Sequence, residues 1–412
     1  MNNNNTYYFG LLKEIYYQAL TSVDPLKFIP QFITVKNNRI IINKNSYRID
    51  RLDRIVVIAT GKASISMSYG FESAANTVNF EGLAITKYGH YKQNEFPLQK
   101  IKVIESSHPY PDQNSLEAGS EMIRLLENLT ENSLVVFLIS GGTSSLVECL
   151  KNEFTLNDLQ ELNRRVVNSG VEIKLINEQR KIISLIKDGG ILNFAYPAKV
   201  ESLILSDVIG NDLKTIGSGM TVLSDNTSVV ISGFYESNLS NTICADNNTL
   251  INSAIAYAEK SNYKIINLGS FTENILNVST RISKTILEEL AYLKSFNKLL
   301  FIGGGEATLE VKGNGKGGRS QELALRFIQT VKDFNPKIGV YALFSGSDGT
   351  DGPTDAAGGF ATNKINISDN ELELSLENND SYNLLKKHGL LFKTGPTNTN
   401  VCDVFLIMII NE

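Results

Sequence analysis

Apolar runs rich in β-branched residues alternate with longer helical patterns along most of the chain. The runs lie at 54–60, 100–106, 133–140, 200–208, 263–269, 298–304, 338–346 and 401–410. Most are apolar throughout, as strands buried on both faces of a sheet are. Amphipathic segments at 115–128, 157–168 and 276–294 lie between them and predict helices. The alternation predicts an α/β fold with mostly parallel sheets covered by helices on both faces.

A polar stretch rich in serine and asparagine, from about 224 to 248, interrupts this alternation. Asp246, near its end, is a good N-cap for a following helix. The length of 412 residues favours two domains. We therefore expect an N-terminal Rossmann-like α/β domain over 1–235 and a C-terminal α/β domain over 236–412.

The overall composition excludes several classes of partner. A formal net charge of -5 argues against a nucleic-acid-binding face. Cys149, Cys244 and Cys402 lie far apart and form no C-x-x-C motif, so we expect neither a disulfide framework nor a zinc site, and a reducing cytosol. The longest apolar run, 404–410, is far shorter than the roughly 20 residues that span a bilayer. We expect a cytoplasmic protein with small-molecule ligands and no nucleic-acid or membrane partner, and a homo-oligomer stays open.

Small and polar residues follow nearly every strand, as ligand-binding turns at the carboxyl ends of parallel strands do. Lys62 follows a strand and a glycine turn, where its ammonium could neutralise a phosphate; a solvated surface lysine is the alternative. Ser140-Gly141-Gly142, with Ser144 close behind, suits either an anion-binding turn or a plain tight turn. Asp207 could hold Mg²⁺, accept a hydroxyl proton or cap the next segment.

Further candidates lie in two later loops and one proline turn. Asp348 and Asp351 occupy a Gly- and Pro-rich loop that does not match a calcium-binding loop, yet suits a cation or substrate hydroxyls; a solvated turn is the alternative. Asn400 could bind a ligand or stabilise its own turn. His108 precedes Pro109, and a rigid turn holding a hydrogen-bonded histidine is favoured over a catalytic base.

The stretch GNGKGGRSQE (313–322) matches both a dinucleotide fingerprint and a phosphate loop with arginine in place of lysine. The fingerprint lacks its acidic residue at the end of the next strand, because Asp333 precedes that strand and Asp348 lies in its own loop. Arginine is not equivalent to the phosphate-loop lysine. We interpret the stretch as a glycine-rich turn that delivers Arg319 to a helix N-terminus facing an anion.

Taken in order, these motifs resemble one family, the glycerate 2-kinases whose C-terminal half is called the MOFRL domain. The resemblance covers most of the chain. The matching stretches are GKAS (61–64), SSHPYPDQNS (106–115), SGGTSSL (140–146), NEQRKIIS (177–184), LILSDVIGNDLKTIGSG (203–219), GGGEATLEVKGNGKGGRSQELAL (303–325), SDGTDGPTDAAGG (347–359) and TGPTNTNVCD (394–403).

The resemblance implies ATP- and Mg²⁺-dependent phosphorylation of D-glycerate to 2-phosphoglycerate, in a cleft between two α/β domains. Lys62 and Arg319 would stabilise charge on the transferred phosphoryl group, and Asp207 would hold the metal or receive the hydroxyl proton. The residues expected to contact ATP or substrate are Ser140, Gly141, Gly142, Ser144, Glu306, Gly317, Gly318, Asp348, Asp351 and Asn400. Two alternatives stay open: an NAD(P)H-dependent hydroxypyruvate or tartronate-semialdehyde reductase, and a binding protein without turnover.

Overall fold

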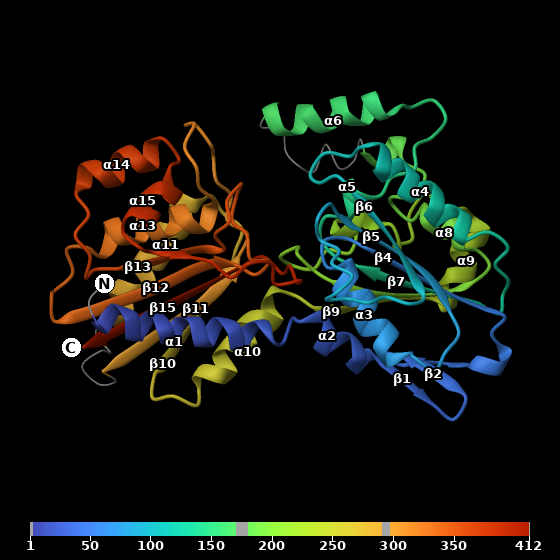
Figure 1. Ribbon diagram of the computed structural model, residues 1–412, viewed down its shortest axis with the longest axis horizontal. Helices are drawn as coiled ribbons and strands as arrows, with labels where there is room; N and C mark the ends of the chain where they lie inside the picture. The colour runs from blue at the N-terminus through green and yellow to red at the C-terminus, as the bar shows by residue number, and fades with distance from the viewer. Residues whose placement is uncertain (1–2, 170–179, 291–296, 412) are drawn as a thin grey trace. The chain divides into compact units, whose positions relative to one another are not determined.

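The structure, a computed structural model, describes residues 3–169, 180–290 and 297–411 (Figure 1). Contacts divide the chain into two compact units. The N-terminal unit comprises 24–245 and 398–400, and the C-terminal unit comprises 1–23, 246–397 and 401–412. The first helix therefore belongs with the second half of the chain, whereas the expected boundary between 235 and 236 grouped it with the first half.

The N-terminal unit is built on a six-stranded sheet in which every neighbouring pair is parallel. In sheet order the strands are β6 (Ile101–Ser106), β5 (Glu81–Lys87), β4 (Arg54–Thr60), β7 (Ser133–Ile139), β8 (Lys199–Leu205) and β9 (Leu239–Ala245). Val135 and Phe137 of β7 face a buried cluster with Met122, Leu192 and Tyr235. The parallel arrangement expected from the apolar runs is confirmed for this unit.

The helices of this unit are α2 (Pro25–Phe28), α3 (Ser64–Ala74), α4 (Gln113–Leu125), α5 (Thr143–Leu146), α6 (Leu156–Ser169), α8 (Ile191–Ala195) and α9 (Val229–Asn238), with 3₁₀ turns at Ile29–Phe32, Ile49–Arg51 and Ile216–Gly219. Among them, α3, α4, α5 and α9 pack against strands of the sheet. A small antiparallel sheet joins β1 (Ile33–Lys36), β2 (Arg39–Ile42) and β3 (Asn45–Arg48). The polar stretch around 224–248 folds as α9 and the edge strand β9, and the boundary between the two units falls near its end, between 245 and 246.

The sheet of the C-terminal unit is mixed. In sheet order the strands are β10 (Lys264–Phe271), β11 (Lys298–Gly305), β15 (Asp403–Asn411), β12 (Ile338–Gly346), β13 (Gly358–Thr362) and β14 (Leu391–Phe392). Only β10 and β11 are parallel neighbours, so the expectation of a mostly parallel sheet does not extend to this unit. The reason is the connections: β12 and β13 are joined by a loop without a crossover helix, and antiparallel neighbours need none.

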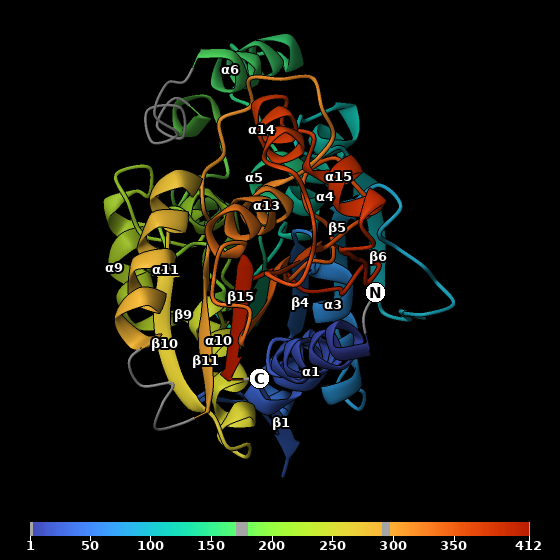
Figure 2. The same cartoon turned by 90° about the vertical axis from the view of Figure 1, so that its left-hand side faces the viewer.

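The helices of the C-terminal unit lie on the two faces of its sheet (Figures 1 and 2). They are α1 (Asn3–Leu20) and α10 (Asn247–Ala258) on one face, and α11 (Ile275–Glu289), α13 (Arg319–Val331), α14 (Asp369–Glu377) and α15 (Ser381–Lys387) on the other. Asp246 caps α10 as expected, since its carboxylate accepts a hydrogen bond from the Thr249 amide. Positions 291–294 of the expected helix and 177–179 of NEQRKIIS lie outside the described residues. Among the helices that are described, none is long and apolar enough to cross a membrane.

Candidate functional site

The loops that follow β4, β7 and β8 gather polar residues at one edge of the N-terminal sheet. Lys62 follows β4, and its backbone N–H donates to the Gly141 carbonyl after β7 at 2.8 Å. Ser140 ties the same loops together, because its hydroxyl oxygen accepts from the Ala63 amide at 3.1 Å. Since parallel strands all end at one edge, the fold brings together side chains far apart in sequence.

The double glycine of the SGG turn is required by what lies against it. A Cβ added at Gly141 would lie 1.7 Å from Oδ2 of Asp207 and 3.0 Å from Nδ2 of Asn400. One added at Gly142, whose φ is +90°, would lie 3.2 Å from both the His108 ring and the Lys62 side chain. Four other segments of the N-terminal unit therefore converge on these two glycines.

Asn400 belongs to this group through two hydrogen bonds of its segment. Its side-chain amide donates to Oδ2 of Asp207 at 3.2 Å. Two residues earlier, the Asn398 carbonyl accepts from the Ser66 hydroxyl at 2.7 Å, which anchors the segment to α3. Ser144 lies on α5, where its hydroxyl is 2.6 Å from that of Ser218. The predicted residues Lys62, Asp207 and Asn400 are thus close together in the structure.

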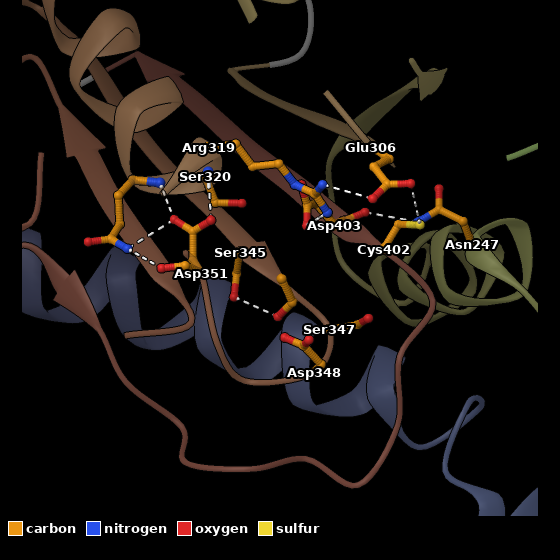
Figure 3. Close-up of polar contacts among 12 residues, drawn as sticks. Asn247, Glu306, Arg319, Ser320, Ser345, Ser347, Asp348, Asp351, Cys402 and Asp403 are labelled. Carbon is orange, nitrogen blue, oxygen red and sulfur yellow. Dashed lines mark hydrogen bonds and ion pairs between the residues drawn. The ribbon is translucent and has the colours of Figure 1, made fainter. Parts of the chain in front are cut away.

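A second polar group in the C-terminal unit centres on Arg319, the first residue of α13 (Figure 3). Its Nε and Nη2 donate to the two carboxylate oxygens of Asp403 at 2.7 and 3.1 Å, and its Nη1 donates to Oε1 of Glu306 at 2.9 Å. Bidentate arginine–carboxylate pairs orient the guanidinium as well as attract it. Asp403 therefore fixes the orientation of the Arg319 guanidinium, and Glu306 binds the guanidinium at its remaining nitrogen, Nη1.

Burial and charge shift the pKa values in this second group in opposite ways. Burial raises the pKa of Asp403 to about 7, against the opposing attraction of Arg319. Burial lowers the pKa of Arg319, but the charges and hydrogen bonds of Asp403 and Glu306 outweigh burial and raise it overall. Arg319 is therefore a permanent cation in this environment.

Asp351 has an internal role in the structure. Its buried carboxylate accepts from the backbone amides of Ser320 and Gln321 at 3.2 and 2.8 Å, and from the Gln321 side chain at 3.0 Å. These amides belong to the first turn of α13, whose N-cap, Gly318, has no side chain to satisfy them. Asp351 caps the helix that carries Arg319. Asp348 accepts from the amide and hydroxyl of Thr350, both at 3.0 Å.

The glycines of the 313–322 stretch are explained by packing within the unit. A Cβ at Gly313 or Gly315 would lie 2.3 or 2.5 Å from the Asn378 carbonyl oxygen. At Gly317 it would meet the Ser381 hydroxyl at 2.1 Å, and at Gly318 the Asp351 carboxylate at 2.3 Å. None of these four glycines has a positive φ. The first three glycines pack on the α14–α15 loop and the start of α15, and Gly318 packs on Asp351, so the resemblance to nucleotide fingerprints is incidental.

One member of these groups was missed by sequence reasoning. Asp403 was overlooked, although a carboxylate within the apolar run 401–410 should have suggested a buried cationic partner. The rigid-turn role of His108 stays a prediction, and its ring lies beside Gly142, 3.2 Å from where an added Cβ would be. The predicted cleft between the two units stays a prediction, because each group is defined within its own unit.

Comparison with known proteins identifies the family. The model described as "Domain of unknown function (DUF4147)" matches residues 11–240, and that of the MOFRL family matches 299–403. A D-glycerate 2-kinase of Thermotoga maritima is 33% identical over 87% of this chain and 91% of the relative. The chain belongs to the MOFRL-family glycerate 2-kinases. This confirms the resemblance seen in the motifs.

Two further comparisons extend the match to nearly full length. A glycerate 2-kinase of Sulfurisphaera tokodaii is 31% identical over 97% of this chain and 100% of the relative. The crystal structure of a glycerate kinase from Thermotoga maritima superposes with a TM-score of 0.81 at 30% identity, covering 97% of this chain and 99% of that chain. The expected two-domain α/β fold of the family is confirmed.

Proposed function

We propose that the protein transfers the γ-phosphoryl group of ATP to the 2-hydroxyl of D-glycerate, giving 2-phosphoglycerate and ADP. Family membership supports this reaction class. The observation that carries the proposal is the convergence of Lys62, Asp207 and Asn400 on the SGG turn of the N-terminal unit. Phosphoryl transfer needs positioned cations and a proton acceptor more than covalent catalysis, and this turn gathers both.

Each residue has a role that its chemistry allows. The Lys62 ammonium would stabilise negative charge on the transferred phosphoryl group, with Arg319 as the second cation. Asp207 would orient the glycerate hydroxyl and accept its proton, while the Asn400 amide, 3.2 Å away, holds that carboxylate. We propose Asp403 and Asp351 as positioning residues, because they orient Arg319 and cap its helix. The remaining contacts expected at Ser140, Ser144, Gly317, Gly318, Glu306 and Asp348 stay predictions.

Mg²⁺ fits the donors that are present. Within residues 3–169, 180–290 and 297–411, no three or more His, Cys, Asp or Glu side chains gather as a metal cage. Mg²⁺ is usually held through one or two carboxylates together with substrate phosphates and water. A single carboxylate such as Asp207 therefore suits a metal that arrives with ATP. When bound, Mg²⁺ would neutralise charge on the phosphate oxygens.

The reductase alternative finds no support in the geometry of the glycine-rich stretch. A dinucleotide fingerprint joins a strand directly to a helix, with glycines that make room for the pyrophosphate. Here β11 ends at Gly305 and α13 begins at Arg319, and the glycines between them pack against the α14–α15 loop, the start of α15 and Asp351. We keep the cytoplasm as the expected location.

Purified protein incubated with D-glycerate, ATP and Mg²⁺ tests the proposal. Phosphorus NMR should show ADP and 2-phosphoglycerate forming together, and omission of glycerate should leave ATP intact. A 3-phosphoglycerate product would correct the position of transfer. Oxidation of NAD(P)H by hydroxypyruvate without any ATP-dependent product would overturn it. Lys62→Ala and Arg319→Ala should each lower kcat by orders of magnitude. Lys62→Ala should leave the unfolding temperature nearly unchanged, whereas Arg319→Ala should lower it, because the buried Asp403 carboxylate loses its cation.

A further inference from the structure

The two carboxylates on Arg319 differ in how firmly they are held. The Asp403 side chain is only 4% exposed and binds the guanidinium through two hydrogen bonds. The Glu306 side chain is 50% exposed and binds it through a single hydrogen bond to Nη1. The Asp403 contact is thus a permanent part of the unit, whereas the Glu306 contact lies where solvent and ligands have access.

The backbone of Glu306 is held independently of its side chain. Its amide donates to the Phe271 carbonyl at 2.8 Å, directly after Gly305, where φ is +126° and a Cβ would lie 2.1 Å from the same oxygen. The Glu306 side chain can therefore leave Arg319 without unfolding the end of β11. Exposed ion pairs of this kind contribute little to stability, so separating the pair costs little.

A carboxylate and a phosphate can bind the same edge of a guanidinium, because both are anionic and both accept hydrogen bonds from its N–H groups. We propose that Glu306 holds the place of a phosphate oxygen of ATP on Nη1 of Arg319, and that ATP binding displaces it. The proposal rests on the proposed function, because it assigns Arg319 to the phosphoryl donor. Asp403 stays bound to Nε and Nη2 and holds the orientation of the guanidinium during the exchange.

The test compares two neutralising substitutions by titrating ATP, with and without Mg²⁺, in calorimetry without glycerate. Glu306→Gln removes the competing charge but keeps the shape of the side chain. Glu310→Gln is the matched control, because Glu310 is an exposed carboxylate nearby in sequence that pairs with Lys312. We expect Glu306→Gln to lower the Kd for ATP about two- to fivefold, as removal of a weak competing ion pair should, and Glu310→Gln to leave it unchanged.

A double substitution shows whether the effect acts through Arg319. In an Arg319→Ala background, Glu306→Gln should no longer change the Kd for ATP, because the two residues then share no contact. An unchanged or higher Kd for Glu306→Gln alone overturns the proposal. A Kd that rises only with Mg²⁺ present overturns it in favour of a metal contact. Because binding is measured without glycerate, absence of glycerate phosphorylation would count against the proposed function and not against this exchange.

Discussion

Alanine at position 141 is expected to disable the proposed site by displacing one carboxylate. The added Cβ would lie 1.7 Å from Oδ2 and 2.3 Å from Cγ of Asp207. The φ of Gly141 is not positive, so alanine suffers no backbone strain of its own and the substitution isolates the collision. Ordinary contact begins at 3.4 Å, so the Asp207 carboxylate must retreat by about 1.7 Å.

The size of the effect follows from that displacement. A misplacement of about 1 Å in a catalytic group can cost about 10²-fold in rate. We therefore expect kcat for D-glycerate phosphorylation to fall at least about 100-fold. Crowding of this kind typically destabilises a fold by about 1–3 kcal/mol, so the protein should stay folded. Steady-state turnover and urea denaturation measure the two quantities separately.

Gly233→Ala is the matched control in the same unit. Gly233 lies within α9, and nothing lies within 4 Å of its added Cβ, so the same chemical change should leave turnover unchanged. It should also add about 0.5–1 kcal/mol of stability, because glycine weakens a helix interior. Most of the stability cost of Gly141→Ala should disappear in an Asp207→Ala background, where the carboxylate is gone and only the 3.0 Å approach to Nδ2 of Asn400 remains. Turnover within about threefold of wild type in folded Gly141→Ala would refute the reasoning.

Three further outcomes are expected. Asp403→Asn should raise the KM for ATP and lower kcat about tenfold or more, because Arg319 loses its bidentate carboxylate partner. Steady-state kinetics measures both constants, and unchanged values would show that Asp403 does not position Arg319. Lys187→Met should destabilise the protein by about 3–5 kcal/mol, since it leaves the buried Glu148 carboxylate without its ammonium, and adding Glu148→Gln should restore most of the loss in urea denaturation. Burial raises the pKa of Cys244 to about 12, so roughly one thiol in ten thousand is ionised at pH 8 and its reaction with a disulfide reagent should speed up about tenfold per pH unit. The part of the reaction that is lost in Cys244→Ser belongs to the Cys244 thiol. If that thiol reacted as fast in the native protein as in the unfolded protein, the raised pKa would be contradicted.

The apolar pattern predicted the strands well but could not give their directions. β12 and β15 are buried along almost their whole length, as the parallel strands β4 and β7 are, yet β12 and β15 run antiparallel. Burial on both faces produces the same continuous apolar run in either direction. Direction is set by the connections, and a loop that replaces a crossover helix leaves no periodic signal.

The candidate site was predicted where a local turn brings its residues together. Lys62 and the SGG turn were found because strand, glycine and helix start follow one another in sequence. The role of Asp351 was not predicted, because the backbone amides that it caps belong to α13, 30 residues earlier in the chain. From sequence a carboxylate in a glycine-rich loop looks like a ligand contact, and only the fold shows that the helix end already uses it.

The order of the units along the chain limits how this protein could be divided or recombined. Residues 24–245 are an insertion within the C-terminal unit, which begins with α1 and resumes at α10. The MOFRL match at 299–403 covers only part of that unit, because the two sheet neighbours of β11, β10 and nearly all of β15, lie beyond its ends. A gene fusion cut at the limits of sequence similarity would expose both edges of β11. An exchange between relatives would have to carry three separate stretches of the gene together.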